Sequence, residues 1–442
     1  MSTPLNLEAN SGLVEHVDTF CNGVTPTLPG AIVHVADRTN SAIFSYASGG
    51  RPYSSLSRST QFKVHSVTKI FGAVAFMQLV ERGLVSLDDP QVIKDLLPEL
   101  YEKKVLVAFD PDTKDAVFED REGSITPRML MNHTNGTGSS FFNSRLHAYL
   151  MASYNDWETV NEASDAWGVI MRSPLVSQPG TKTEYGVGFD WLAVLIKRLL
   201  KNQTLEDHMK KHIFQPLGMT GTGYEGQYGG DVAVEGRFWP RQLKVGEGVF
   251  VAMEDGQGNP LSAHETEEEL KAASNDKEGG KNTFHPLGSG LISTAEDLTR
   301  FFTTIFLNRG TDPTSGNQIL SARSVDEIIK PQIPESLRNR SRSIPSAVPA
   351  LVCPIDLGGA SIDPEGSYGF GCAVQGQVRR LEGVGRGRGK GSVYWFGAAN
   401  TEWWADIEAG IVGVMTGNYF PWNERAWLEF TKGMEERIYG GL

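Results

Sequence analysis

A serine and a lysine three positions apart carry the first recognisable chemistry in the chain. Ser66-Val67-Thr68-Lys69 leads into the apolar periodic run IFGAVAFMQLV, which predicts a helix that starts at about Ser66 and ends near Gly83. Positions i and i+3 share one helix face, so the Lys69 amine can approach the Ser66 hydroxyl and act as its base. Taken alone, however, an S-x-x-K motif favours a plain helix cap, so its meaning depends on context.

Tyr185 is the second residue whose type and place suit catalysis. It comes shortly before the helical run DWLAVLIKRLL. A phenol that reaches a nucleophilic serine can carry a proton to the leaving group. The alternative is a buried aromatic residue that anchors the following helix, and the residues alone favour that alternative.

Strand-like segments near both ends of the chain must position these residues. AIVHVADR and AIFSYASG flank turn residues and predict a β-hairpin, and YGFGCAVQ, SVYWFGAA, TEWWADI and GIVGVMTG follow late in the chain. The periodic segments between them are mostly helical. We therefore expect an α/β domain made of residues 1–85 and 290–442. It would hold a mainly helical insertion, 86–289, with a polar surface excursion at 254–282.

Composition excludes several classes of function. The chain has 442 residues, 40% hydrophobic and 21% charged, with a net charge of −12. An acidic globular chain argues against a nucleic-acid partner, and without a run of 18 apolar residues no membrane span is expected. The start lacks a secretory pattern. Three well-separated cysteines, with no C-x-x-C pair, predict reduced thiols, a cytoplasmic location and no metal site.

Five segments, in order along the chain, resemble those of one family. QFKVHSVTKIFGAVAFMQLVERGLVSLDDP resembles the nucleophile helix of class C β-lactamases and their related esterases, and ITPRMLMNHTNGTG resembles their T-x-R-x-L-L-x-H-T-S-G segment. PGTKTEYGVGFDWLAVLIKRLL resembles the segment with their catalytic tyrosine. LGSGLISTAEDLTRFF is similar to their G-G-G-L-x-S-T-A-x-D helix start, and WFGAANTEWWADIEAG to the strand pair that carries K-T-G or W-G-G. The chain is identified as a member of the serine β-lactamase, or penicillin-recognising, superfamily.

This resemblance implies a fold and a set of catalytic groups. The fold would be the α/β (α+β) sandwich of β-lactamases and DD-peptidases, an antiparallel sheet flanked by helices with an inserted helical domain. Ser66 would be the nucleophile, and Lys69 and Tyr185 would handle its proton. The backbone N–H groups of Ser66 and Ala398 would form the oxyanion hole. No metal or cofactor is implied, and His133 would be structural rather than catalytic.

Two departures from the family pattern bear on the substrate. Val187 stands where β-lactamases have the asparagine of Y-x-N, and Trp395-Phe396-Gly397 stands in place of K-T-G. Both side chains that would grip a β-lactam are missing, which favours esters or thioesters. We expect substrate contacts from these four residues and from Trp403, on the following strand.

Within the superfamily, two segments resemble fungal polyketide acyltransferases of the statin side-chain type. These are the run from GRGKGS through WFGAANTEWWADIEAGIVGV and the Y-G-x-G-x-D-W segment. The likeness implies a serine acyltransferase that moves an acyl group from a thioester or ester to a small natural-product alcohol. The donor could sit on an acyl carrier protein. The basic loop with Arg386, Arg388 and Lys390 could contact that carrier or a pantetheine phosphate, although such a run is more often a solvated hairpin turn.

Three alternatives remain beside acyl transfer. The first is a carboxylesterase of small esters, since family VIII carboxylesterases are neighbours of these acyltransferases. The second is a β-lactamase or DD-peptidase, which the missing K-T-G and Y-x-N motifs disfavour. The third is a non-catalytic scaffold, which the intact Ser66, Lys69 and Tyr185 disfavour.

Overall fold

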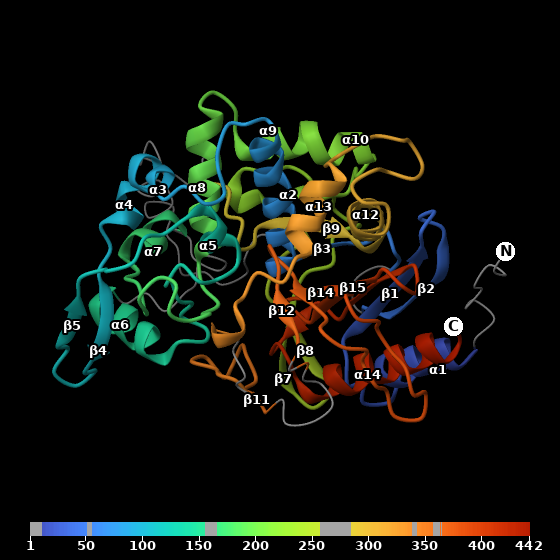
Figure 1. Cartoon of the computed structure of the whole chain (residues 1–442). Helices are drawn as coiled ribbons and strands as arrows, with labels where there is room; N and C mark the ends of the chain where they lie inside the picture. The colour runs from blue at the N-terminus through green and yellow to red at the C-terminus, as the bar shows by residue number, and fades with distance from the viewer. Residues whose placement is uncertain are drawn as a thin grey trace.

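Short alternating apolar segments form one antiparallel sheet at the centre of the protein. The computed structural model describes residues 11–50, 55–154, 166–256, 284–337, 343–356, 363 and 365–442. Its largest sheet has seven strands in the order β12-β13-β14-β15-β16-β1-β2, with antiparallel neighbours throughout (Figure 1). These strands are β1 (Gly30–Asp37), β2 (Ala42–Gly49), β12 (Ser367–Tyr368), β13 (Ala373–Val374), β14 (Val393–Gly397), β15 (Thr401–Asp406) and β16 (Ile411–Thr416).

The first two strands confirm the predicted hairpin. β1 and β2 pair from Gly30 with Gly49 up to Ala36 with Ala42. In the turn, Asp37 Oδ1 accepts hydrogen bonds from the backbone N–H groups of Thr39 and Ser41. Such a turn closes the hairpin because a short acceptor side chain satisfies backbone donors that no strand partner reaches.

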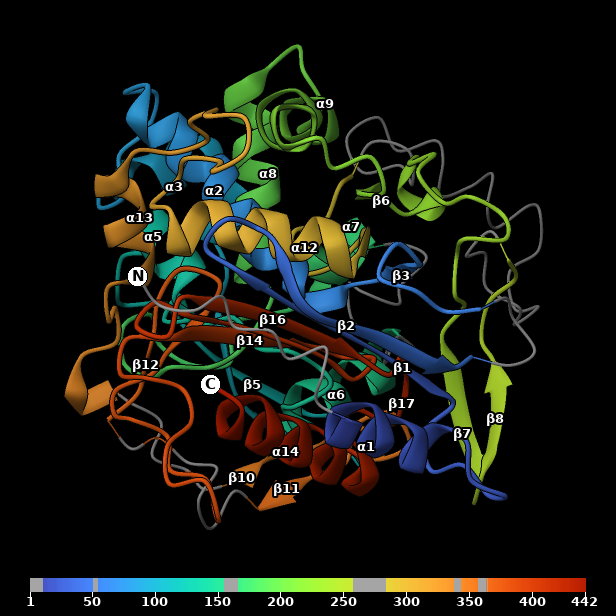
Figure 2. The ribbon, with the colours of Figure 1, turned by 90° about the vertical axis from the view of Figure 1, so that its right-hand side faces the viewer.

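Helices cover both faces of the sheet, as Figure 2 shows. Successive side chains of a strand point to opposite faces. Trp404 therefore belongs to the core beneath α1 and α14, while Trp403 belongs to the core on the side of α2 and α12. The result is the predicted sandwich of helices, antiparallel sheet and helices. The four helices are α1 (Ser11–Cys21), α2 (Thr68–Glu81), α12 (Ala295–Phe302) and α14 (Arg425–Gly440).

Helix α2 is buried on every side from Thr68 to Leu79. A helix that is apolar all round is typical of a core element. A tight 3-10 turn, His65–Val67, leads into it, so the helical segment starts where the sequence predicts. It also ends as predicted, with Gly83 in the left-handed region at φ +69°.

The predicted insertion is only partly helical. Its described residues contain the hairpin β4-β5 and eight α-helices. Strand β8 pairs with β7, but β6 and β7 also pair outside the insertion, with β9 and β17. Strands of two to five residues give too short a periodic signal to be read from the sequence. The bounds are α3 (Gln91–Leu96), α4 (Pro98–Tyr101), β4 (Val105–Phe109), β5 (Ala116–Glu119), α5 (Pro127–Met131), α6 (Ser144–Tyr154), α7 (Ala166–Arg172), α8 (Gly188–Leu200), α9 (Leu205–Met209), α10 (Gln215–Leu217), β6 (Gly223–Tyr224), β7 (Gln242–Gly246) and β8 (Val249–Ala252).

The remaining elements join these parts. β3 and β6 flank β9 in one small sheet, and β17 pairs with β7 in another. None of the helices within the described ranges combines the length and apolar character that crossing a membrane requires. The remaining bounds are β3 (Gln61–Lys63), β9 (Leu291–Thr294), α13 (Ala322–Ile329), β10 (Ser343–Ile344), β11 (Ile355–Asp356) and β17 (Tyr419–Phe420).

A buried charge cluster includes Glu254, the first residue of the predicted surface excursion at 254–282. Residues 257–282 lie outside the described residues, but Glu254 is fully buried. Its carboxylate contacts Lys63 Nζ at 2.9 Å and Arg241 Nε at 2.5 Å, and Lys63 Nζ also lies 2.8 Å from Glu225. A buried carboxylate persists only when cations compensate its desolvation. The cluster ties β3, three residues before Ser66, to the β7-β8 hairpin.

We predict that Glu254→Gln lowers the free energy of unfolding by about 3–5 kcal/mol, because it leaves a buried cation without its partner. Burial alone would raise the pKa of Glu254, but the charges of Arg241 and Lys63 lower it to about 2. A depressed carboxyl pKa stabilises the fold above the unfolded value and loses that effect as pH falls toward the folded value. Denaturant unfolding between about pH 2 and pH 7 measures both effects.

The matched control is Glu382→Gln. The Glu382 carboxylate is 89% exposed and lies 3.5 Å from Lys432 Nζ, so its loss should change stability by less than about 1 kcal/mol. If the two variants lose equal stability, or if Glu254→Gln keeps the acid-induced loss of the wild type, the buried cluster does not stabilise the fold.

Candidate active site

Ser66 lies in the turn before α2, with two possible proton carriers on its hydroxyl oxygen. Lys69 Nζ donates to Ser66 Oγ at 3.1 Å, and Tyr185 OH donates to the same oxygen at 2.7 Å. Ser66 is 8% exposed. The structure thus brings Tyr185 into contact with a serine that lies 119 positions before it in the sequence. A serine held between an amine and a phenol can lose its proton to one and receive it back through the other.

The Lys69 amine is fixed by contacts from three segments. Besides Ser66 Oγ, it donates to the carbonyl oxygen of Gly288 at 2.6 Å and lies 4.8 Å from the centre of the Tyr185 ring. Lys69 is 2% exposed. The loop before β9 therefore orients this amine toward the serine.

Three aromatic rings hold the Tyr185 side chain in place. Its ring centre lies 4.6 Å from that of His133, 5.6 Å from that of Phe142 and 5.7 Å from that of Trp395. Such contacts fix a ring without taking up its hydroxyl. The phenol oxygen therefore remains directed at Ser66.

His133 supports the packing of the Tyr185 ring, and its hydrogen-bond partner is Tyr368 rather than Ser66. Its Nε2 lies 3.2 Å from Tyr368 OH. Burial, and then the charge of Lys69, lower the pKa of His133 well below its usual value, so the ring is neutral near pH 7. This arrangement fits the structural role expected for His133.

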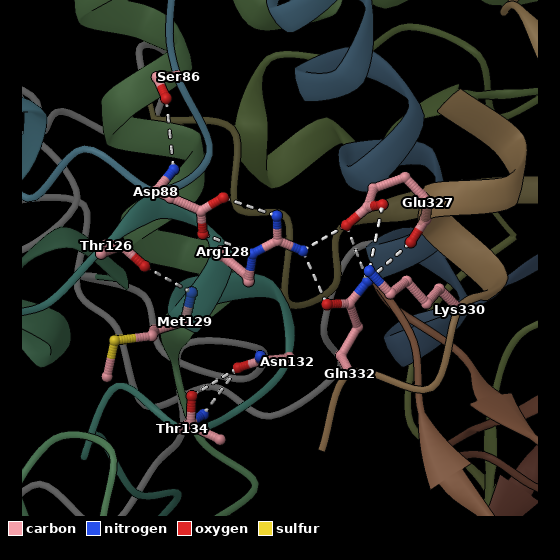
Figure 3. Close-up of polar contacts among 10 residues, drawn as sticks. All are labelled: Ser86, Asp88, Thr126, Arg128, Met129, Asn132, Thr134, Glu327, Lys330 and Gln332. Atoms are coloured by element: carbon pink, nitrogen blue, oxygen red, sulfur yellow. Dashed lines mark hydrogen bonds and ion pairs between the residues drawn. The ribbon is translucent and has the colours of Figure 1, made fainter. Parts of the chain in front are cut away.

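An ion-pair network anchors the segment that carries His133 (Figure 3). Thr126 caps α5 by accepting from the Met129 N–H. Arg128 Nε and Nη2 donate to the two carboxylate oxygens of Asp88 at 2.6 and 2.8 Å, and Nη1 donates to Glu327 Oε1 at 2.5 Å. A guanidinium that bridges two carboxylates fixes planar geometry. The network joins α5 to α13. It thereby holds the segment whose His133 ring packs against Tyr185.

The end of β14 packs against the turn that bears the serine. A Cβ added to Gly397 would lie 2.5 Å from the carbonyl oxygen of Val64, so only glycine fits this close approach. Ala398 follows directly and is half-buried. The strand end and the serine turn are thus adjacent, while the oxyanion hole formed by the Ser66 and Ala398 N–H groups stays a prediction.

Apolar side chains occupy the place of the polar family residues. Val187 is half-buried against the main core. Trp395 contacts Phe396, whose ring centre lies 6.4 Å from that of Trp422, and the Trp422 ring lies 5.9 Å from that of Phe142. We call Phe142, Trp395, Phe396 and Trp422 the aromatic wall. Sequence reasoning does not find Phe142 and Trp422, because they come from loops far from β14.

The structure does not bring Trp403 to this site. Its indole stacks on Phe302 with ring centres 4.0 Å apart and also faces Phe306 at 5.6 Å. Trp403 is only 1% exposed. Strand alternation predicts that Trp403 and Trp404 point to opposite faces, but it does not predict that Phe302 of α12 covers Trp403, and this burial speaks against the expected substrate contact.

The basic loop also differs from expectation. Arg388 is 3% exposed, and its guanidinium contacts Glu435 at 3.0 Å and stacks over Trp404 at 5.3 Å. Arg386 pairs with Glu408 at 2.6 Å. Arg388 is therefore a core ion pair and cannot contact a carrier protein.

Asp190 is a buried residue of this region that sequence reasoning does not find. Its Oδ1 accepts from the Gly288 N–H at 2.8 Å. Burial raises the pKa of Asp190 to about 6 against the opposing effect of Lys69. The available signal is an aspartate inside the otherwise apolar helical run GFDWLAVLI. Among the described residues, no cluster of three or more His, Cys, Asp or Glu side chains is placed to hold a metal ion.

Comparison with known proteins shows the family of this chain. A profile of the β-lactamase family matches residues 18–431. The chain is 25% identical to the monacolin J acid methylbutanoyltransferase of Aspergillus terreus, over 93% of this chain and 92% of that protein. It is 26% identical to the lovastatin esterase of Penicillium rubens, over 88% of each.

A solved structure of similar fold is the unliganded simvastatin synthase from Aspergillus terreus. It is 24% identical, with a TM-score of 0.72 over 97% of this chain and 98% of that one. This agreement shows that the two chains share their fold. The chain belongs to the β-lactamase family.

Proposed function

We propose that the protein is a serine acyltransferase that moves an acyl group from a thioester or ester to a small natural-product alcohol. The observation that carries this proposal is the position of Ser66 Oγ between Lys69 Nζ and Tyr185 OH, at 3.1 and 2.7 Å. The similarity to a methylbutanoyltransferase over almost the whole chain supports transfer rather than another use of the serine.

The reaction would run through an acyl-enzyme. Ser66 Oγ attacks the acyl carbonyl carbon while Lys69 takes its proton, and the N–H groups of Ser66 and Ala398 stabilise the oxyanion. The bond to the leaving thiol or alcohol then breaks, Tyr185 delivers a proton to that group, and Lys69 passes the serine proton on to Tyr185. An acceptor alcohol attacks the acyl-enzyme, loses its proton to the same pair, and leaves Ser66 protonated again. These steps require only groups of this chain.

The substrate class follows from Val187 and Trp395. β-Lactam recognition of the family type needs an amide and a cationic side chain at these positions, and each lost charge-assisted contact is worth about 1.5–3 kcal/mol. Esters and thioesters need neither contact. These residues therefore support an ester or thioester donor and disfavour a β-lactamase or DD-peptidase.

The aromatic wall supports an apolar acceptor. Its four half-buried rings form a continuous series of contacts from Tyr185 to Trp422. An apolar surface beside the acyl-enzyme can align a bulky alcohol and keep water away. Water and alcohol compete for the same acyl group, so a carboxylesterase is the second candidate, and the similarity to the lovastatin esterase favours it.

Two finer points belong to the same proposal. The acyl donor would be either a small thioester or a thioester bound to a carrier protein. Because Arg388 is buried, residues other than Arg388 would have to contact such a carrier. A cytoplasmic location is supported by the three unpaired cysteines.

We predict that Lys69 and Tyr185 act as one unit. Tyr185→Phe should lower kcat by about 10²–10⁴-fold, because the phenol no longer passes a proton. The double variant with Lys69→Ala should be little slower than either single variant, since residues of one catalytic unit are not additive. Steady-state kinetics with a p-nitrophenyl ester gives the comparison. Multiplied losses in the double variant would show separate roles, provided circular dichroism reports an intact fold in each.

We predict that acyl transfer exceeds hydrolysis when a suitable alcohol is present. The enzyme is given a short-chain activated thioester, with and without polyketide alcohols, and ester and free acid are measured. The expected result is slow release of acid in water alone and predominant ester with at least one acceptor, because the wall aligns the alcohol. Fast donor turnover in water, with free acid dominant for every acceptor, would establish the esterase instead.

The control for this partition is Trp422→Leu. The change keeps an apolar side chain but removes an aromatic wall member whose indole makes no hydrogen bond to the described part of the chain. It should raise the fraction of free acid while leaving Ser66 acylation near the wild-type rate. An unchanged product ratio with every acceptor would show that the wall does not bind the alcohol.

A further inference from the structure

Asp190 and Lys69 contact the same residue from two sides. Asp190, in the first turn of α8, accepts from the Gly288 N–H at 2.8 Å. Lys69 Nζ, from α2, donates to the Gly288 carbonyl oxygen at 2.6 Å. Asp190 and Lys69 are both 2% exposed. The loop that orients the lysine is therefore itself held by the carboxylate.

The carboxylate lies close to the Gly288 backbone. A Cβ added to Gly288 would lie 2.5 Å from Asp190 Oδ2 and 2.8 Å from Oδ1. Because side-chain atoms cannot approach so closely, the position admits only glycine without a shift of the loop or of Asp190. This tight fit limits the directions in which the Gly288 carbonyl can point.

Asp190 also interacts electrostatically with Lys69. Burial raises the pKa of Asp190 to about 6, and the charge of Lys69 and the backbone N–H groups of Gly288 and Leu287 oppose that rise. Burial raises the pKa of Tyr224, in β6, well above its usual value, and the charges of Glu206 and Asp190 raise it further. The ionised Asp190 carboxylate is therefore the form that stabilises a positive charge on Lys69.

The geometry points to Asp190 as a positioning residue for the reaction. Through Gly288 it keeps the Lys69 amine directed at Ser66, and its negative charge favours the ammonium that forms when Lys69 takes the serine proton. This role rests on the proposed function and extends it, because Asp190 touches neither the serine nor the acyl group.

The test compares Asp190→Asn with a matched buried aspartate. Asp297 is 8% exposed, its Oδ2 accepts from the Gly221 N–H at 2.9 Å, and burial raises its pKa, but its charged neighbours are Arg300 and Glu296. Asp297→Asn therefore removes a buried charge that clamps a loop glycine away from Lys69. The readout is the single-turnover release of p-nitrophenol from a p-nitrophenyl ester as a function of pH, per folded enzyme.

We expect Asp190→Asn to slow acylation by at least about tenfold and to move its acid limb to lower pH, because an ammonium at Lys69 loses its counter-charge. Asp297→Asn should lose stability but keep the wild-type rate and pH profile. Equal rates and an unmoved acid limb in the two variants would overturn the role of Asp190. A wild type that releases no p-nitrophenol would overturn the proposed function, and with it this role.

Gly288→Ala provides a second variant if Asp190→Asn does not fold. The added methyl group displaces the loop from the carboxylate but keeps the charge, so acylation should slow by at least about tenfold while the acid limb stays near the wild-type pH. A folded Gly288→Ala enzyme with the wild-type acylation rate would show that the Asp190–Gly288 contact does not position Lys69.

Discussion

The candidate site depends on the confinement of one buried amine. Lys69 Nζ is held at the same time by Ser66 Oγ, the Gly288 carbonyl oxygen and the ring face of Tyr185. A buried amine needs partners to offset its desolvation. These partners come from the start of α2, the loop before β9 and the segment before α8. Much of the fold serves to bring these three segments together.

The serine turn is constrained from both sides as well. His65 has a left-handed backbone at φ +47° and is buried, and such a conformation persists in a non-glycine residue only where the surroundings enforce it. Arg241 Nη1 lies 3.3 Å from His65 Nε2 and connects the turn to the Lys63–Glu254 cluster. The end of β14 packs on the other side, at Gly397. The nucleophile therefore sits on a turn that has little freedom to move.

Local patterns predict the elements that carry the site but not their long-range partners. Periodicity and motif resemblance were enough for the β1-β2 hairpin, for α2 and for the meeting of Ser66 with Tyr185. Glu254 appears in the sequence as the start of a polar segment, because one of its two cations, Lys63, lies far away along the chain and the pairing with either cation depends on tertiary packing. Alternation along the strand separates Trp403 from Trp404, but the covering of Trp403 by Phe302 of α12 depends on tertiary packing. The link from Asp190 to Lys69 runs through Gly288, which is distant in sequence and is seen only in the folded structure.

The most direct test is to identify the residue that carries the acyl group. The enzyme is mixed with an activated short-chain ester, quenched, and analysed by intact-mass and peptide mass spectrometry. The account predicts one added acyl group on the peptide that contains Ser66, and none in a folded Ser66→Ala variant. An acyl group on another residue, or full turnover by Ser66→Ala, would contradict it.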